Sequence, residues 1–286
     1  MRRRLPPWFK QKIPDPAVMH SMKRILDGLN LHTICESARC PNIGACFSRN
    51  TATFLILGDV CTRHCTFCAV KKGTPVPVDE SEPQHLLKAV KSLGLEYVVI
   101  TSVTRDDLAD GGATQFVKAI ELLHQQGNGV KVEVLIPDFG GSAEALKTVI
   151  QAKPEVINHN VETVPRLYPE VRPEASYNHS LELLCEVKRM DPTIVAKSGL
   201  MLGLGETKEE VIEVMRDLRE ANCDLLTIGQ YLRPSPSHHP VVAFISPEEF
   251  SAYEQIGRKM GLIEGAAAPL VRSSYKASEL YAKVKG

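Results

Sequence analysis

Six of the eight cysteines lie within one stretch of 34 residues, and they form two groups of three. The first group, Cys35, Cys40 and Cys46, has the spacing C-x4-C-x5-C, and the second, Cys61, Cys65 and Cys68, has C-x3-C-x2-C. A structural zinc usually takes four protein ligands, so three thiolates leave one position open. In a cubane iron-sulfur cluster the iron without a cysteine can bind another ligand, as a chemically active cluster requires. One zinc shared by both groups, or buried free thiols, is the alternative.

The rest of the chain indicates a compartment in which such thiols stay reduced. No stretch approaches the roughly 18 apolar residues that a membrane span needs, and no apolar segment follows the arginines of the opening MRRRLPPWFK. The opening is also unlike a leader rich in serine and arginine. We therefore expect a cytoplasmic protein without a membrane segment, whose cysteines are metal ligands or catalytic thiols and not disulfides.

The charges balance over the whole chain but not along it. There are 34 Lys and Arg against 34 Asp and Glu, and a net charge of zero argues against non-specific nucleic-acid binding. Residues 1–50 carry a net charge of +6 and residues 271–286 one of +3, which leaves −9 between them. We expect the basic ends to dock an acidic partner, with ordinary solvated lysines as the alternative.

The elements that must position the cysteines alternate between short β-branched runs and segments of helical period. This pattern is typical of parallel strands joined by helical crossovers. The expected strands are residues 53–58, 96–102, 131–137, 155–161, 194–202 and 224–232. Six βα units are two short of a closed barrel, so the sequence predicts an α/β fold, an open partial (β/α)6 TIM-like barrel with its site at the C-terminal ends of the strands.

Three parts follow from this division: an N-terminal extension (1–52), the barrel (53–262) and a C-terminal extension (263–286). We expect both extensions to close the barrel mouth. The N-terminal extension should contain at most one helix, over residues 18–29.

The sequence also predicts the starts of two helices and the character of the two remaining cysteines. Thr207 with Glu210, and Ser246 with Glu249, have the spacing of a capping box at a helix start. Cys185, on an expected helical stripe, and Cys223, before a strand, are interpreted as small apolar residues.

The second cysteine group resembles the signature of the radical S-adenosylmethionine (SAM) superfamily. In that superfamily C-x3-C-x2-C follows the first strand, often with an aromatic residue before the third cysteine, and Phe67 stands at that place. The resemblance implies that Cys61, Cys65 and Cys68 hold a 4Fe-4S cluster whose fourth iron binds SAM. An electron from the cluster would cleave SAM to a 5′-deoxyadenosyl radical. An alkyl C–H bond has no acidic proton, so we expect no catalytic side-chain acid or base.

Other segments resemble SAM-contacting parts of the superfamily. INHNVET resembles the fourth-strand segment of biotin synthase, which implies that Asn160 and Glu162 hold the ribose hydroxyls from one face of a strand. A strand-end turn with solvated polar side chains is the alternative for these two residues. Gly111 and Gly112 stand where many members have Gly-Gly-Glu near the SAM amino group, but Ala113 replaces the glutamate.

Over nearly the whole chain, the motifs resemble the lipoyl synthase family in their content and order. They are PPWFKQKIP, CESARCPNIGACF, ATFLILGDVCTRHCTFCAV, TSVTRDDLADGGA, NHNVET and RSSYKA. The resemblance implies an enzyme that inserts two sulfur atoms into an octanoyl chain carried on a lysine of a lipoyl-carrier protein. It also implies an auxiliary 4Fe-4S cluster as sulfur source, held by the first cysteine group and by Ser274. Ser273 is the alternative ligand, and both serines could instead cap a helix that begins near Lys276.

The partners that this resemblance implies are octanoylated lipoyl domains of 2-oxoacid dehydrogenases, the glycine cleavage H protein and an electron donor, but neither nucleic acid nor a membrane. The basic ends would then dock an acidic carrier. Three alternatives stay open: biotin synthase, which lacks the first cysteine group and RSSY; an electron carrier with two clusters, which needs no strand-helix array; and a binding module stabilised by zinc.

Overall fold

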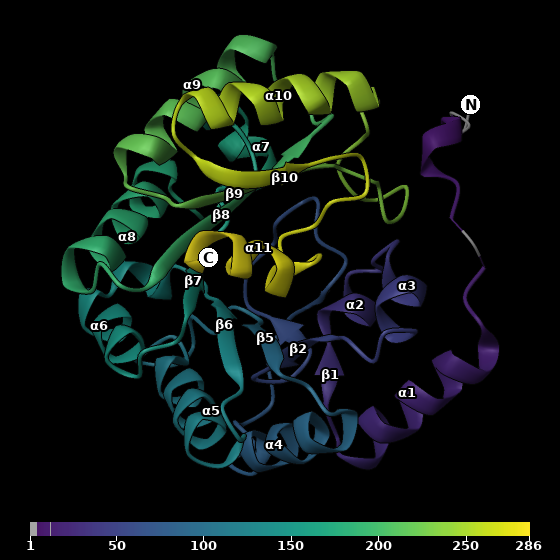
Figure 1. Ribbon diagram of the computed structural model, residues 1–286, viewed down its shortest axis with the longest axis vertical. Helices are drawn as coiled ribbons and strands as arrows, with labels where there is room; N and C mark the ends of the chain where they lie inside the picture. The colour runs from purple at the N-terminus through teal and green to yellow at the C-terminus, as the bar shows by residue number, and fades with distance from the viewer. Residues whose placement is uncertain (1–4, 12) are drawn as a thin grey trace.

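The computed structural model describes residues 5–11 and 13–286, without the side chains of residues 263–265. Its centre is a curved sheet in the order β1-β2-β5-β6-β7-β8-β9-β10, in which only β1 and β2 are antiparallel neighbours. The strands are β1 (His32–Thr33), β2 (Thr53–Ile56), β5 (Tyr97–Ser102), β6 (Lys131–Leu135), β7 (Val156–Asn158), β8 (Val195–Leu202), β9 (Leu225–Gln230) and β10 (Ile263–Ala267). Helices surround the outer face of this sheet (Figure 1). The predicted open partial barrel is confirmed.

The six strands expected from sequence are all present, with two differences. β7 ends at Asn158, three residues earlier than expected, and a further parallel strand, β10, pairs with β9. Residues 263–267 therefore continue the barrel sheet, although we expected them in the C-terminal extension. Their sequence, IEGAA, contains one β-branched residue and a glycine, so it carries little strand signal of its own.

The helices also follow the sequence pattern. They are α1 (Pro16–Gly28), α2 (Ile34–Ser37), α3 (Ile43–Phe47), α4 (Glu82–Leu93), α5 (Ala113–Gln126), α6 (Ala143–Gln151), α7 (Tyr168–Val171), α8 (Tyr177–Met190), α9 (Lys208–Glu220), α10 (Pro247–Lys259) and α11 (Ala277–Lys285). Both expected capping boxes are confirmed, at Thr207 of α9 and at Ser246 of α10. Among the described residues, we find no helix that combines the length and the apolar character of a membrane span.

The N-terminal extension contains more structure than its sequence suggested. The expected helix is present as α1, which buries Met22 and Leu26, but β1, α2 and α3 follow it. Helix α3 packs closely on the segment that precedes α1, since a Cβ atom at Gly44 would lie 2.5 Å from Cγ of Pro14. This contact fixes α3, which carries one cysteine of the first group.

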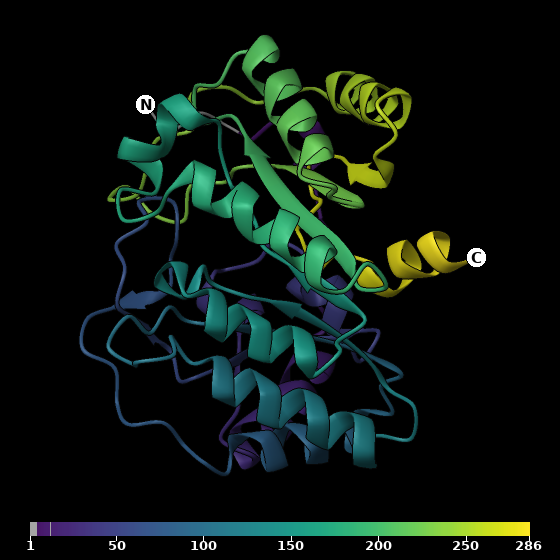
Figure 2. The same cartoon turned by 90° about the vertical axis from the view of Figure 1, so that its left-hand side faces the viewer.

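The C-terminal helix α11 covers the N-terminal ends of the barrel strands. Leu280 packs in a cluster with Val156, Val195 and Leu225, and the Tyr281 ring lies 5.8 Å from the Tyr97 ring. Figure 2 shows α11 on the side opposite the small ribbon of β3 (Val60–Cys61) and β4 (Lys71–Lys72). The C-terminal end of the chain is therefore anchored at the N-terminal ends of the barrel strands.

A buried ion pair lies inside the barrel. Lys197 Nζ donates to Glu133 Oε1 at 2.7 Å, and the Tyr97 hydroxyl donates to Glu133 Oε2 at 2.7 Å. The Lys197 and Glu133 side chains are 0% and 1% exposed. Removing two charges from water is costly, so each depends on the other for compensation.

The first prediction concerns this pair. Lys197→Met leaves a buried carboxylate without its cation and should lower the free energy of unfolding by about 3–5 kcal/mol. Lys197→Met combined with Glu133→Leu should cost less than the single change, because no lone charge remains. Chemical denaturation followed by circular dichroism compares the variants. Equal losses in the single and double variants would contradict the pairing.

A buried histidine joins three elements of the barrel wall. His159 is 1% exposed, with Nδ1 at 2.9 Å from the Ile136 carbonyl oxygen and Nε2 at 3.0 Å from Ser180 Oγ. Burial lowers the pKa of His159 to about 4, and the nearby Arg172 adds to this effect. The imidazole is therefore neutral in the folded protein at neutral pH.

The second prediction follows from that lowered pKa. In the unfolded chain the pKa of His159 is about 6.5, so below this pH the unfolded state binds a proton that the folded state excludes. The stabilisation is complete above about pH 6.5 and declines as the pH falls, by about 2 kcal/mol between pH 7.5 and pH 5. Unfolding free energies of the protein and of His159→Gln at both pH values test this. The expected result is a smaller decline in the variant, and parallel declines would refute the assignment.

Candidate active site

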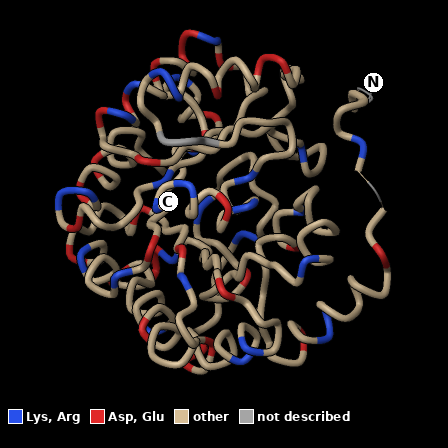
Figure 3. Tube along the Cα trace, in the orientation of Figure 1, with Lys and Arg blue, Asp and Glu red and all other residues tan. Residues whose placement is uncertain are grey.

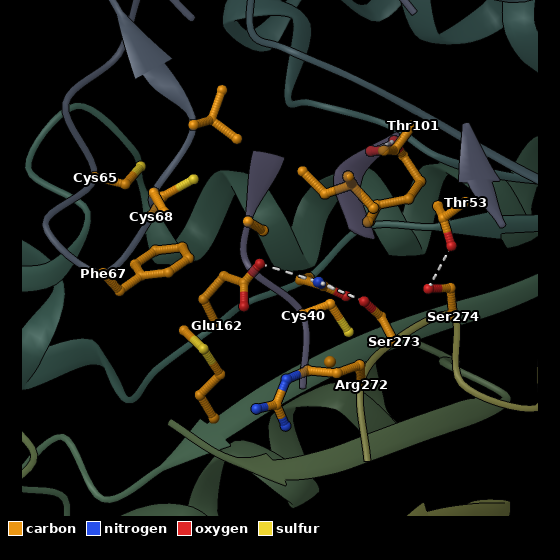
Figure 4. A pocket seen from close by; sticks show the side chains of 18 of the residues that line it. Cys40, Thr53, Cys65, Phe67, Cys68, Thr101, Glu162, Arg272, Ser273 and Ser274 are labelled. Carbon is orange, nitrogen blue, oxygen red and sulfur yellow. Dashed lines mark hydrogen bonds between the residues drawn. The ribbon is translucent and has the colours of Figure 1, made fainter. Parts of the chain in front are cut away.

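A cavity of about 490 Å³ opens at the C-terminal ends of the barrel strands, and five of the six clustered cysteines line it. They are Cys35, Cys40, Cys61, Cys65 and Cys68, while Cys46 lies close enough to Cys40 to interact with it electrostatically. Residues 271–274 of the C-terminal segment line the same cavity. The structure therefore brings together the three motifs that the sequence separates, and Figure 4 shows this pocket from close by.

The second cysteine group occupies the loop after β2, as the sequence predicted. The ribbon β3–β4 closes this loop, since Cys61 pairs with Lys72. The Thr66 amide donates to the Val171 carbonyl at 3.0 Å, and the Cys68 amide donates to the Cys65 carbonyl at 3.3 Å. Phe67 lines the cavity next to these thiols, as Figure 4 shows.

One arginine inside the C-x3-C spacing fixes this loop to two neighbouring loops. Arg63 donates to both carboxylate oxygens of Asp106, at 2.8 Å each, and to both of Asp138, at 2.6 Å each. Asp106 follows β5 and Asp138 follows β6. The Arg63–Asp138 pair is shielded from water, with side chains 10% and 8% exposed, whereas the Asp106 side chain is 41% exposed. Bidentate pairs of this kind hold a fixed orientation, so the cysteine loop is positioned from two sides.

Burial favours the neutral thiol at two cysteines of the second group, Cys65 and Cys68. It raises the pKa of Cys68 to about 12 and also raises the pKa of Cys65, although Arg172 opposes the shift at Cys65. Thiolate ligation would remove these protons, so metal binding and proton release are coupled here.

The first cysteine group is formed by α2, the turn after it and α3. Cys35 is buried, and burial raises its pKa to about 12, against the effect of hydrogen bonds from Thr53. Burial also raises the pKa of Cys46, with a further contribution from Cys40. Three soft sulfur donors therefore lie near one another beside the first barrel strand.

The two serines of RSSY point to different partners. Thr53 Oγ1 donates to Ser274 Oγ at 2.8 Å, which places Ser274 next to the residue that contacts Cys35. Asn160 Nδ2 donates to Ser273 Oγ at 3.2 Å. Helix α11 begins with Lys276 at its N-cap and has no side-chain cap, so the alternative that the serines cap this helix is wrong.

Asn160 and Glu162 both face the cavity, but not as strand residues. β7 has ended at Asn158, and Glu162 has a φ of 64°. Asn160 Nδ2 donates to Glu162 Oε1 at 3.0 Å, while Asn160 Oδ1 is buried without a partner. A Cβ atom at Gly199 would lie 2.6 Å from that oxygen, so a larger residue there would displace the Asn160 amide. Burial raises the pKa of Glu162, and Arg172 opposes the shift.

Gly111 and Gly112 are not among the residues that line the cavity. Gly112 is the N-cap of α5 with a φ of 90°, and a Cβ atom there would lie 2.3 Å from Leu57 Cδ1. In the structure, these glycines form a turn and allow close packing at the start of α5. Their predicted contact with SAM stays untested.

Sequence reasoning missed two arginines of the site, Arg63 and Arg172, and misjudged one cysteine. Both arginines line the cavity, as does Arg272 of RSSY. The position of Arg63 within C-x3-C was its only sequence signal, and Arg172 had none. Cys185 is exposed on α8, so its interpretation as an apolar stripe residue is wrong, whereas Cys223 is buried as expected.

The arrangement of donors distinguishes the two kinds of metal site. All eight cysteines are free thiols. Across residues 5–11 and 13–286, no three Cys, His, Asp or Glu side chains converge on a point where one metal ion could bind. A cubane cluster does not require such convergence, because each cysteine binds a different iron. Three soft thiol donors in each group suit iron in a sulfide-rich cluster.

Comparisons with known proteins agree with this geometry. The radical SAM superfamily matches residues 55–218, and the N-terminal domain of lipoyl synthase of that superfamily matches residues 1–40. The fold resembles methylornithine synthase, with a TM-score of 0.56 at 15% identity, covering 86% of this chain and 84% of that one. It also resembles SuiB of Streptococcus suis bound to its precursor peptide, with a TM-score of 0.59 at 10% identity, covering 93% and 57%.

Full-length relatives are much more similar. A lipoyl synthase of Caldanaerobacter subterraneus subsp. tengcongensis is 57% identical over 96% of both chains. A lipoyl synthase of Caldicellulosiruptor saccharolyticus is 54% identical over 98% of both chains. The chain therefore belongs to the lipoyl synthase family of the radical SAM superfamily.

Proposed function

We propose that this protein inserts two sulfur atoms into an octanoyl chain bound to a lysine of a carrier protein, and so forms the lipoyl cofactor. The observation that carries the proposal is that cysteines of both groups line one cavity, together with Arg272, Ser273 and Ser274 of RSSY. Membership of the superfamily implies one 4Fe-4S cluster and SAM. A single cluster would need only one of these groups.

We assign the SAM-binding cluster to Cys61, Cys65 and Cys68. Their loop follows β2, is held in place by Arg63 and faces Glu162 and Asn160 across the cavity. Asn160 offers a buried amide oxygen without a partner, which suits a hydroxyl donor such as a ribose. This observation supports Asn160 and Glu162 as cofactor contacts.

We assign the auxiliary cluster to Cys35, Cys40 and Cys46, with Ser274 as fourth ligand. The support for Ser274 over Ser273 is its hydrogen bond to Thr53, which also contacts Cys35, whereas Ser273 contacts Asn160 instead. An alkoxide is a harder ligand than a thiolate and binds iron in a sulfide-rich cluster less firmly. Such a ligand suits a cluster that has to give up sulfide.

The protein's own part in the reaction is to position the substrate and exclude water. When bound, SAM with its cluster supplies the carbon radical that removes a C–H hydrogen, and the auxiliary cluster supplies sulfur. Leu135, Met201 and Val103 give the cavity an apolar wall that suits an alkyl chain. No side chain has to move a proton at the reacting carbon. We propose octanoylated lipoyl domains and the glycine cleavage H protein as carriers.

The third prediction separates the two cysteine groups. Alanine at Cys61, Cys65 or Cys68 should abolish SAM cleavage, because no cluster remains to pass an electron. Alanine at Cys35, Cys40 or Cys46 should leave some SAM cleavage but abolish lipoyl formation. Chromatography of 5′-deoxyadenosine and lipoyl product measures both. Equal loss of deoxyadenosine in the two sets would overturn the division.

The fourth prediction concerns the serines. Ser274→Ala and Ser274→Cys should both assemble iron at the auxiliary site yet form little lipoyl product, the Cys variant because its cluster is too stable to give up sulfide. Ser273→Ala loses one hydrogen bond, of about 1 kcal/mol, and should retain most product formation with up to about fivefold weaker SAM binding. Mössbauer spectra, product yields and SAM titration measure these effects. Normal turnover of Ser274→Ala with failure of Ser273→Ala would make Ser273 the ligand.

A further inference from the structure

The mouth of the cavity carries three exposed basic side chains from three separate segments. Arg39 belongs to the N-terminal extension, Lys72 to β4 and Arg233 to the loop after β9, and all three line the cavity. We refer to these three residues as the rim cations.

The rim cations donate hydrogen bonds to carbonyl oxygens and not to carboxylates. Arg39 Nη1 donates to the Pro234 carbonyl at 3.2 Å, and Lys72 Nζ donates to the Cys65 carbonyl at 2.9 Å. Arg233 Nε donates to the His238 carbonyl at 2.8 Å. None of the ion pairs found among the described residues includes a rim cation.

Other basic residues near the cysteine loop differ in this respect. Lys71, next to Lys72, pairs with Asp59 at 2.5 Å, and Arg63 pairs with two aspartates. Deeper in the cavity, Arg172 and Arg272 face Glu162 and the cysteines. The rim cations are therefore an uncompensated positive group at the entrance.

One contact also joins two of the segments that carry these charges. Arg39 donates to the carbonyl of Pro234, the residue after Arg233. Basic side chains that line one entrance without a carboxylate partner attract an anionic group that approaches it. Because lysine is short compared with a protein domain, a carrier whose acylated lysine enters the cavity has to bring its own surface to this rim.

We propose that the rim cations dock an acidic surface of the carrier protein that flanks its octanoylated lysine. This inference rests on the proposed function, of which it specifies the partner. It adds two charges of the cavity mouth, Lys72 and Arg233, to the basic chain ends considered in the sequence, while Arg39 belongs to both groups. Lys and Arg are distributed along the trace between the two ends (Figure 3). Charges at the edge of an interface act mainly on association and on its salt dependence.

The experiment compares two substrates with the triple variant Arg39→Gln, Lys72→Gln and Arg233→Gln. One substrate is an octanoylated H protein, and the other is a short neutral peptide that carries octanoyl-lysine. Dithionite serves as reductant, so that no electron-donor protein takes part. The matched control, Lys88→Gln, Lys91→Gln and Lys208→Gln, removes the same charge from exposed positions on α4 and α9.

We expect the ratio of kcat/KM for the H protein to kcat/KM for the peptide to fall about tenfold in the rim variant at 50 mM salt, but to change less than twofold in the control. At 1 M salt, where the Debye length is about 3 Å, the difference should disappear. Iron content and melting temperature of each variant check that the mouth stays folded. A direct binding titration of the H protein should show the same salt dependence.

Two outcomes would overturn the inference. One is an unchanged ratio in a rim variant that retains its iron and melting temperature. The other is a defect that appears only when an anionic redox protein replaces dithionite, which would assign the rim to the electron donor. Wild-type turnover of the peptide tests the proposed function separately, since a neutral peptide does not need the rim.

Discussion

The hydrogen bond between Thr53 and Ser274 is the contact on which the arrangement of this site depends. It joins the first residue of β2 to a serine 221 residues later in the chain, beside a cysteine of the first group. Anchoring of α11 at the far end of the barrel and pairing of β10 with β9 both constrain the segment that carries Ser274. Because the chain is held on both sides of RSSY, Ser274 is placed beside Thr53 at a small cost in entropy.

Two effects determine which groups in the cavity are charged: burial, which favours neutral thiols, and ion pairing, which compensates Arg63. Desolvation raises the pKa values of Cys35 and Cys68 to about 12, so these thiols are neutral until a metal displaces their protons. Arg63 forms ion pairs with two aspartates and not with a thiolate. These pairs fix the cysteine loop in the absence of a metal. Under the proposed assignment, preorganisation of this kind would lower the cost of assembling a cluster in the loop.

The sequence was informative where local pattern decides structure. Periodic apolar runs define the barrel strands, and the capping boxes at Thr207 and Ser246 formed as expected. β10 could not be predicted in the same way, because IEGAA becomes a strand only by pairing with β9. The same limit applies to Arg63: its spacing was visible, but its partners Asp106 and Asp138 come from two other loops that only the fold brings together.

The side-chain amide of Asn160 connects Glu162 to the RSSY segment. Asn160 Nδ2 donates to Glu162 on one side and to Ser273 on the other. Ser273 and Ser274 are the central residues of a turn that the Tyr275 amide closes by donating to the Arg272 carbonyl at 2.9 Å, so a backbone shift at one serine moves the other. A ligand that draws Glu162 into a new hydrogen bond therefore loosens or pulls the contact to Ser273, and through it the position of Ser274. Glu162 and Ser274 are therefore linked by a short path through Asn160 and Ser273, and under the proposed assignment this path would couple the SAM contacts to the ligands of the auxiliary cluster.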